Sequence, residues 1–166
     1  MRLATPELMT RVDWRRVLLF WGDERCVPPD DPASNYRMAR EALLDHVPIP
    51  AGNVHRMRGE MEPGEAAAEY ERTLRAFLTP ALEETNAVDD VPGSRFDLVL
   101  LGMGEDGHTV SLFPRSSALG EGKRMAVATY VDNLQSWRVT LTPVLINAAA
   151  QVTFIVSGEY KAEALR

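Results

Sequence analysis

The sequence predicts an α/β domain built on a mostly parallel sheet with helices on both faces. Short apolar runs alternate with amphipathic segments along the chain, which is the pattern of strands connected by helices. The length of 166 residues is that of one ordinary domain. Hydrophobic residues make up 45% of the chain and charged residues 25%, values that are typical of a globular domain and exclude general disorder.

The first half of the chain contains one predicted strand and two predicted helices. The continuous apolar run 17–21 predicts a buried strand. A helix is predicted over 34–46, because apolar residues recur there at helical spacing and a proline follows. A second helix is predicted over 63–81, and the polar stretch 83–95 after it is predicted to be a surface loop.

The second half of the chain alternates strands and helices more clearly. Strands are predicted at 96–101, 125–131, 138–141 and 151–156, and helices at 143–150 and from Glu159 onward. We therefore expect a single domain over residues 1–166. In open α/β sheets ligands bind beyond the carboxyl ends of the strands, so the loops that follow the strands are the candidate functional sites.

Composition excludes several classes of function. The net charge of −6, from 18 basic and 24 acidic residues, argues against a nucleic-acid partner. The chain has no apolar run near the ~20 residues that span a bilayer, and the sequence shows no secretory signal. Cys26 is the single cysteine, so we expect no internal disulfide, no zinc site and a cytoplasmic location. We expect Cys26 to be a core or loop residue and not a nucleophile.

The first candidate site is Asp23-Glu24-Arg25, directly after the predicted strand 17–21. Two carboxylates and a guanidinium there can bind a polar substrate, and Arg25 can make paired hydrogen bonds with a phosphate or carboxylate. The alternative is a solvated turn with a local ion pair.

The second candidate site is the glycine-rich loop that follows the predicted strand 96–101. Gly102, Gly104 and Gly107 let the backbone approach a ligand, and their N–H groups can surround an anion. His108 closes this loop. Imidazole is the side chain that can take up or release a proton near neutral pH without a large shift of its pKa. A histidine at this position points to acid–base chemistry more than to a structural role.

The same loop fits the pattern G-x-G-x-x-G of dinucleotide-binding proteins. That alternative needs a long helix directly after the third glycine, with its N-terminus at the pyrophosphate. Pro114 interrupts the chain soon after Gly107, and further glycines follow. The sequence therefore disfavours a nicotinamide-dependent oxidoreductase.

The third candidate site follows the predicted strand 151–156. Ser157 and Gly158 lead into a predicted helix with Lys161 one turn in, an arrangement that suits a phosphate. Ordinary capping by Ser157 with an exposed lysine is the alternative. Arg138, at the start of another predicted strand, can add a second cation.

Taken together, these segments resemble one family, the 6-phosphogluconolactonases, relatives of the glucosamine-6-phosphate deaminases and isomerases. The resemblance lies in five segments in the family's order: 20–29, 31–37, 101–114, 138–142 and 157–162. The central segment, 101–114, is highly specific. Arg25, where the deaminases typically have an aromatic residue, and the Ser-Leu-Phe-Pro that ends at Pro114 favour the lactonase branch.

The resemblance implies hydrolysis of 6-phosphoglucono-δ-lactone to 6-phosphogluconate, a step of the oxidative pentose phosphate pathway, with no metal or organic cofactor. It implies His108 as general base, with Asp106 and Arg25 as the other catalytic residues. Arg25, Arg138 and Lys161 are the cations expected to hold the phosphate. The substrate-binding residues expected on this basis are Asp23, Glu24, Asn35, Gly102, Gly104, Gly107, Arg138, Ser157 and Lys161.

The resemblance also implies that this chain covers the middle and later part of the family domain. Family members begin with another strand–helix unit, whose Ser-Gly-Gly-Ser-type loop lines the phosphate site, and they continue beyond the last helix seen here. We therefore expect an incomplete domain and a monomer or weak oligomer. Three alternatives to the lactonase stay open: the sibling isomerase or deaminase, a nucleotide-binding oxidoreductase, and an inactive fragment.

Overall fold

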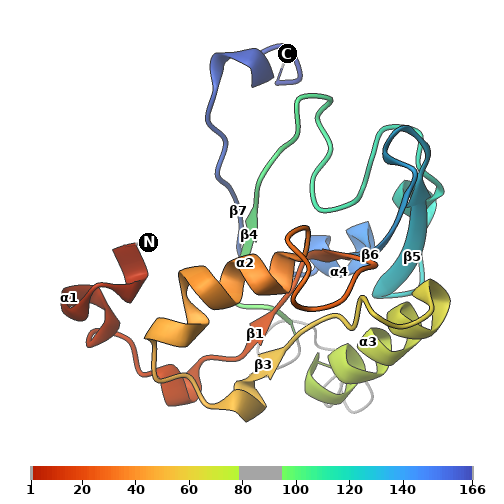
Figure 1. Ribbon diagram of the computed structural model, residues 1–166. Helices are drawn as coiled ribbons and strands as arrows, with labels where there is room; N and C mark the ends of the chain where they lie inside the picture. Colours follow the sequence, from red (N-terminus) through yellow and green to blue (C-terminus); the bar gives the residue numbers. More distant parts are fainter. Residues whose placement is uncertain (1, 79–94, 166) are drawn as a thin grey trace.

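The computed structural model describes residues 2–78 and 95–165. The α/β class is confirmed, with helices and short strands mixed along the chain (Figure 1). The strands are β1 Leu19–Phe20, β2 Asp23–Arg25, β3 Val54–His55, β4 Val99–Leu101, β5 Ala126–Val131, β6 Ser136–Leu141 and β7 Val152–Phe154. The helices are α1 Pro6–Met9, α2 Asn35–Ala42, α3 Pro63–Leu78 and α4 Pro143–Asn147.

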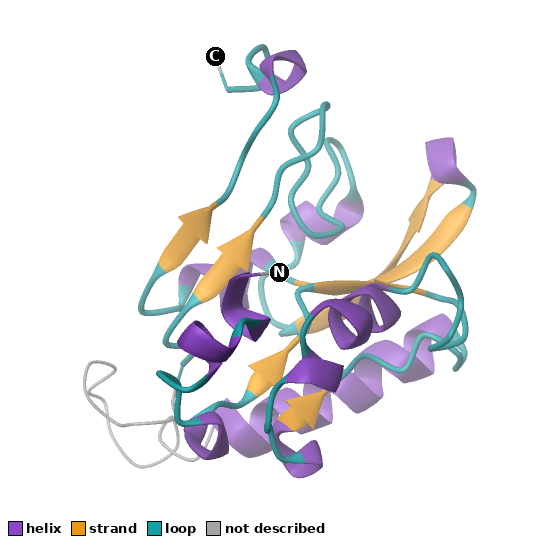
Figure 2. Cartoon of the chain, turned by 60° about the vertical axis from the view of Figure 1, so that its left-hand side comes forward, coloured by secondary structure: helices purple, strands orange, loops and turns teal. Residues whose placement is uncertain are grey.

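Two strand pairs are parallel, as expected from strands connected by helices. β1 pairs with β3, and β4 pairs with β7 with Leu101 opposite Phe154. Both pairs run in the same direction (Figure 2). The chain leaves β1 and β4 at the same end of the molecule, which brings the segments after Phe20 and Leu101 together.

The third sheet is antiparallel, which the alternation of strands and helices did not predict. Its order is β2-β6-β5, with Arg25 opposite Arg138 and Val127 opposite Thr140. The connection from β5 to β6 is short, and Gln135 takes a left-handed conformation in it (φ 46°). A connection of this length joins antiparallel strands, whereas parallel strands need a crossover of a dozen residues or more.

The main core lies between α3 and the strands β5 and β6. Tyr70, Leu74 and Val139 have no exposed surface, and Leu141 is 2% exposed. α3 places its buried residues on one face, as the apolar spacing of its sequence predicts. Burying a side chain of this size contributes about 1.5–3 kcal/mol, so this contact positions β6 and its partner β2 firmly.

Several predicted elements are shorter in the structure. The helix predicted over 34–46 breaks at Leu43 (φ −140°, ψ −57°) and continues as a 3₁₀ turn, Leu44–His46. The strand predicted over 17–21 is Leu19–Phe20, of which both residues are half-buried, and Leu18 before it is 48% exposed. The expected buried strand is therefore only half-buried.

Later predicted elements are also shorter, except the strand expected over 138–141, which begins at Ser136. The strands expected over 96–101 and 151–156 are β4 and β7, of three residues each, and the helix expected over 143–150 ends at Asn147. The helix expected from Glu159 is one 3₁₀ turn, Glu159–Lys161, with no buried residue. A helix this short without a buried face has little to stabilise it. The loop predicted at 83–95 lies outside the described residues apart from Arg95.

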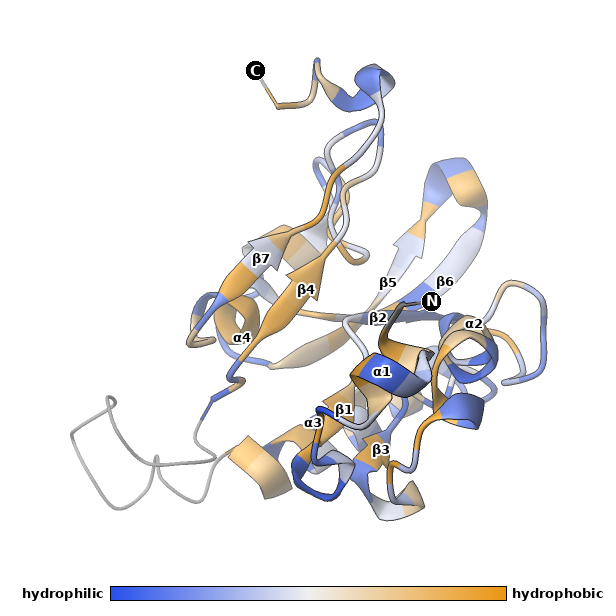
Figure 3. Ribbon diagram, turned by 90° about the vertical axis from the view of Figure 1, so that its left-hand side faces the viewer, coloured by the Kyte–Doolittle hydropathy of each residue, from blue (hydrophilic) through white to orange (hydrophobic). Residues whose placement is uncertain are grey.

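The colouring by hydropathy in Figure 3 shows apolar residues along β4 and over much of β7. Leu100 is 58% exposed and Phe154 is 56% exposed, so part of this apolar surface faces solvent. Within the described residues, no helix is long and apolar enough to cross a membrane.

Candidate active site

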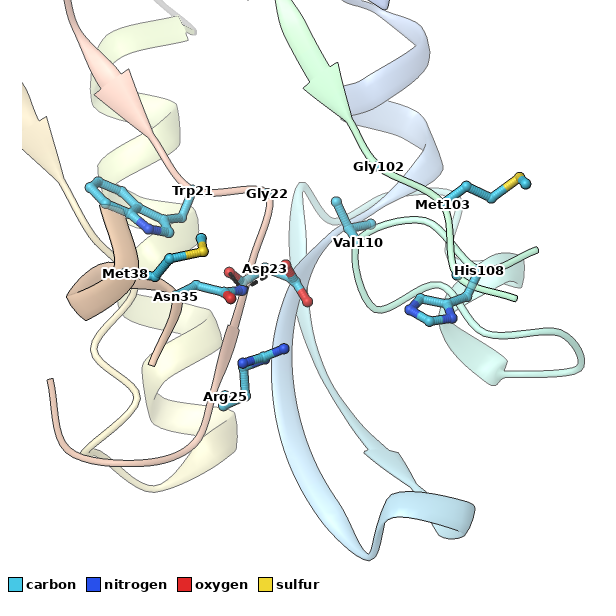
Figure 4. A pocket seen from close by; sticks show the side chains of 11 residues that line it. Trp21, Gly22, Asp23, Arg25, Asn35, Met38, Gly102, Met103, His108 and Val110 are labelled. Atoms are coloured by element: carbon cyan, nitrogen blue, oxygen red, sulfur yellow. Dashed lines mark hydrogen bonds between the residues drawn. The ribbon is translucent and has the colours of Figure 1, made fainter. Parts of the chain in front are cut away.

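A cavity of about 470 Å³ opens beyond the ends of β1 and β4 and alongside β2 (Figure 4). Its walls come from four parts of the chain: the turn after β1, β2 itself, the start of α2 and the glycine-rich loop after β4. The lining residues are Trp21, Gly22, Asp23, Arg25, Asn35, Met38, Gly102, Met103, Gly104, His108 and Val110. Two of the three candidate sites therefore form one cavity.

His108 and Asp106 form a hydrogen-bonded pair at one side of the cavity. His108 Nδ1 lies 2.6 Å from Asp106 Oδ1, and the His108 backbone N–H donates to the same oxygen at 3.2 Å. Burial acts to raise the pKa of Asp106, but the hydrogen bonds from the ring and amide of His108 outweigh it, so this pKa lies below its ordinary value. An ionised Asp106 that accepts Nδ1–H leaves Nε2 as the nitrogen that can take a proton.

Packing also fixes the orientation of the imidazole. Phe113 stacks on the His108 ring, with centroids 4.1 Å apart and planes 24° from parallel. The ring points into the cavity, toward Asp23 and Arg25 (Figure 4). A Cβ at Gly104 would lie 2.2 Å from His108 Nδ1, so glycine is required there for the ring to take this position.

The three glycines of the loop have different roles in the structure. The N–H of Gly104 donates to His108 O at 2.8 Å, and that of Gly107, which has φ +84°, donates to Gly104 O at 3.2 Å. These two amides therefore stabilise the loop itself. Gly102 lines the cavity, and a Cβ there would meet no protein atom within 4 Å, so its missing side chain leaves the cavity open.

Val110 carries backbone strain at the cavity wall. Its φ is 47°, a left-handed conformation that is unfavourable for a β-branched residue. Its Cγ1 lies close to Gly22, where an added Cβ would approach to 2.7 Å. The chain thus turns sharply between His108 and the buried Ser111, and strain of this kind is concentrated at functional sites.

Asp23 is held from two sides. Asn35 Nδ2 donates to Asp23 Oδ1 at 3.0 Å and to its backbone O at 2.9 Å, and Ser111 Oγ donates to Asp23 Oδ2 at 2.7 Å. Ser111 is 1% exposed, and its N–H donates to Thr140 Oγ1 at 3.2 Å. Ser111 was not predicted as a site residue, although it lies in the segment 101–114 that carries the family resemblance.

Arg25 and Arg138 lie directly opposite each other on β2 and β6. Arg25 Nη1 donates to Ala33 O, and neither arginine's buried Nε has a hydrogen-bond partner among the described residues. Burial lowers the pKa of Arg138, and the charge of Arg25 lowers it further. Arg25 lines the cavity, whereas Arg138 lies beside it, so an anion near Arg25 would relieve the repulsion between the two cations.

Glu24 does not reach the cavity, contrary to its prediction as a substrate-binding residue. It is 2% exposed, and its side chain points to the face of β2 opposite Asp23 and Arg25, because successive side chains alternate along a strand. Its oxygens accept hydrogen bonds from residues 34–36 at the start of α2.

Ser157 and Lys161 are likewise not among the residues that line this cavity. Ser157 does not cap a helix, because the residue that precedes the 3₁₀ turn is Gly158, which has no side chain to form a capping hydrogen bond. The Lys161 ammonium lies 5.7 Å from the centroid of the neighbouring Tyr160 ring. The segment does approach the glycine-rich loop, since Ala164 Cβ lies 3.6 Å from the position of a Cβ on Gly107.

Two further expectations concern metal and cysteine chemistry. Among residues 2–78 and 95–165, no group of three His, Cys, Asp or Glu side chains is placed to hold a metal ion. Burial raises the pKa of the Cys26 thiol to about 11, so this thiol stays protonated near neutral pH.

This chain is similar to proteins of one family. A family model described as glucosamine-6-phosphate isomerases/6-phosphogluconolactonase matches residues 1–166. The 6-phosphogluconolactonase of Haemophilus influenzae is 38% identical over 164 residues, 99% of this chain and 65% of that protein. The 6-phosphogluconolactonase of Nostoc sp. is 43% identical over 156 residues, 93% of this chain and 61% of that protein. The structure of 6-phosphogluconolactonase from Trypanosoma cruzi is similar with a TM-score of 0.80 and 33% identity, covering 99% of this chain and 64% of that one.

The chain thus spans less than two thirds of the length of these relatives, while they match it along almost its whole length. The glycine-rich loop, the His108–Asp106 pair and Arg25 all fall within the matched region. Because the family model matches every residue from 1 to 166, the chain belongs to the family of glucosamine-6-phosphate isomerases and 6-phosphogluconolactonases.

Proposed function

We propose that this chain carries the catalytic site of a 6-phosphogluconolactonase, which hydrolyses 6-phosphoglucono-δ-lactone to 6-phosphogluconate. The observation that carries the proposal is the His108–Asp106 pair, which points into a cavity that also contains Arg25. This combination supplies a base for water and a cation for an anionic substrate. The similar proteins that are named 6-phosphogluconolactonases support it.

The first step in this proposal is attack of water on the lactone carbonyl carbon. His108 Nε2 takes a proton from the water while Nδ1–H stays hydrogen-bonded to Asp106, which stabilises the imidazolium that forms. The new C–O bond gives a tetrahedral oxyanion. The bond between this carbon and the ring oxygen then breaks, and the imidazolium returns the proton to the leaving ring oxygen. The product is the open-chain acid, which ionises to a carboxylate.

The two charged groups of the substrate need separate partners. In the δ-lactone, the carbonyl carbon and the carbon that carries the phosphorylated arm are both bonded to the ring oxygen, and the oxyanion forms on the first while the phosphate charge stays on the second. We assign the oxyanion to the backbone around Gly102, since the amides of Gly104 and Gly107 are already used within the loop. We assign the phosphate to Arg25 with Arg138, whose like charges lie on neighbouring strands.

The family resemblance implies that the substrate is a small sugar phosphate and that the enzyme needs no organic cofactor. The single cysteine, which cannot form an internal disulfide, supports a reaction in the cytoplasm.

The test is to supply freshly generated lactone to the purified chain and to measure acid release above the spontaneous rate. A His108→Ala variant should lower kcat by about 10²–10⁴-fold, the usual contribution of a positioned base, without unfolding the chain. Glucosamine 6-phosphate is tested in parallel, with release of ammonia as the readout. Ammonia release without lactone hydrolysis, or a His108→Ala variant with unchanged kcat, would contradict the proposal.

A further inference from the structure

Glu24 is a buried carboxylate whose oxygens are fully used inside the protein. Oε1 accepts the backbone N–H of Arg25 at 2.8 Å and that of Asn35 at 2.7 Å. Oε2 accepts the N–H of Tyr36 at 2.7 Å and the hydroxyl of Ser34 at 3.1 Å. With four donors on two oxygens and 2% exposure, Glu24 has no surface left for a ligand.

Three of these donors belong to the start of α2. Ser34 is the N-cap residue, with its hydroxyl oxygen accepting the N–H of Arg37, and residues 35 and 36 begin the helix. The first N–H groups of a helix have no partner within it and favour a negative charge. Glu24 satisfies two of them, and so it fixes the helix start against the middle of β2.

The segment that Glu24 anchors also holds its two neighbours on β2. The carbonyl oxygen of Ala33 accepts the hydrogen bond from Arg25 Nη1. Asn35 Nδ2 donates to the backbone O and Oδ1 of Asp23. Asp23 and Arg25 therefore reach the cavity on one face of β2 while the segment 33–36, fixed by Glu24, sets their orientation.

We infer that Glu24 is a positioning residue, which holds segment 33–36 against β2 so that Arg25 and Asp23 are presented to the anionic substrate. It makes no contact with substrate. The inference deepens the proposed function and rests on it for the nature of the ligand, whereas the placement of Arg25 and Asp23 by Glu24 is independent of that function.

The decisive variant is Glu24→Gln, which keeps the size of the side chain. A carboxamide has one acceptor oxygen, and its NH₂ group would face a backbone N–H, so the hydrogen bond to Asn35 or Tyr36 is lost. Segment 33–36 should then shift away from β2. Loss of one hydrogen bond between Arg25 and the anion costs roughly 10- to 100-fold in affinity. We therefore expect affinity for 6-phosphogluconate and inorganic phosphate to fall by this factor, with KM rising more than kcat falls.

The matched control is Thr142→Val. Thr142 has no exposed surface, its hydroxyl donates to Arg124 O, and it does not line the cavity. Both variants lose buried hydrogen bonds and should unfold at a lower temperature. Only Glu24→Gln should change the NMR signals of the Arg25 Nε–H and Asn35 Nδ2 groups and weaken binding of the two probes.

The outcomes for the two variants and the unmodified chain distinguish the role of Glu24 from the proposed function. The positioning role is overturned if Glu24→Gln has the same Arg25 and Asn35 NMR signals as Thr142→Val and binds the two probes with the same affinity. Failure of the unmodified chain to bind 6-phosphogluconate would refute the proposed function, while the side-chain signals would still report on Glu24. Should Glu24→Gln not fold, Ser34→Ala removes one donor to Oε2 and must shift the same signals in the same direction, by less.

Discussion

At position 104, the absence of a side chain allows the imidazole of His108 to lie against the backbone. A Cβ there would be 2.2 Å from both Cε1 and Nδ1 of His108 and 2.9 Å from Asp106 Oδ1. Gly104 also donates its N–H to the carbonyl of His108. This glycine therefore determines the geometry of the base, whereas Gly102 leaves room for a ligand and Gly107 supplies a positive φ.

Replacing Gly104 by alanine should displace the His108 ring and separate it from Asp106. We expect kcat for lactone hydrolysis to fall by at least about 10²-fold, the lower end of what a positioned base contributes. The His108 side-chain NMR signals should move as well. Gly122→Ala is the control, since a Cβ at Gly122 meets nothing within 4 Å. Equal activity in the two variants would mean that the loop adapts and that Gly104 does not set the ring position.

The sequence predicted the chemistry of single residues better than their contacts. The glycine spacing and the histidine that closes the loop predict a site there, and in the structure Gly102, Gly104 and His108 line the cavity, with Asp106 bound to His108. Glu24 was predicted as a ligand because carboxylates at strand ends often bind substrate, and only the fold shows that its partners come from residues 34–36. The hydrogen bond from Ser111 to Asp23 joins residues 88 positions apart, and no local pattern predicts such a pair.

At the scale of elements, α3 is tied to the cavity through Tyr70. This side chain has no exposed surface, and its hydroxyl accepts the N–H of Trp21 at 2.8 Å and donates to Trp21 O at 3.0 Å. Burial raises the pKa of Tyr70 above its ordinary value, so the hydroxyl stays protonated and able to donate. The end of β1, where the cavity begins, is thereby held by a helix 49 residues later in the chain.

Tyr70→Phe should destabilise the fold, because it leaves the N–H and C=O of Trp21 unpaired in the core. We expect the free energy of unfolding to fall by about 1–3 kcal/mol, the cost of a buried unsatisfied polar group. Urea denaturation measures this change. The control is Tyr130→Phe on β5, where the side chain is 44% exposed and a much smaller change is expected. An equal effect of the two substitutions would contradict the role assigned to the Tyr70 hydroxyl.

Elements with strong apolar periodicity were predicted, and elements defined by their partners were not. The long helix α3 begins at Pro63, as predicted, because its apolar spacing is clear, and the predicted positions 79–81 lie outside the described residues. The sequence predicts a loop at Asp23-Glu24-Arg25, which has no apolar residue, yet this segment forms β2 and its backbone pairs with β6 over three positions. The antiparallel direction of β5 and β6 depends on a short turn at Gln135, a non-glycine residue in a left-handed conformation.

At the scale of the whole molecule, the strands β4 and β7 present an apolar surface to solvent. Leu98 is 49% exposed and Leu100 is 58% exposed, and these two side chains lie on the same face because successive residues alternate along a strand. Ile155, just after β7, is 66% exposed and lies on the same face as Leu100, whereas Phe154, opposite Leu101, is exposed on the other face. Contiguous exposed apolar residues on a short sheet promote association.

We therefore expect this 166-residue chain to self-associate weakly, with an average mass that rises with concentration in sedimentation velocity. Leu100→Thr should shift the equilibrium toward the monomer, because threonine suits a strand and removes apolar surface. The free energy of unfolding should change by no more than about 0.5 kcal/mol, as for other exposed positions. Leu134→Thr, on the distant turn after β5, removes a leucine that is 50% exposed and serves as the control. If both variants associate as the unmodified chain does, the contact lies elsewhere; if Leu134→Thr alone dissociates it, the contact involves the β5–β6 turn and not the surface of β4 and β7.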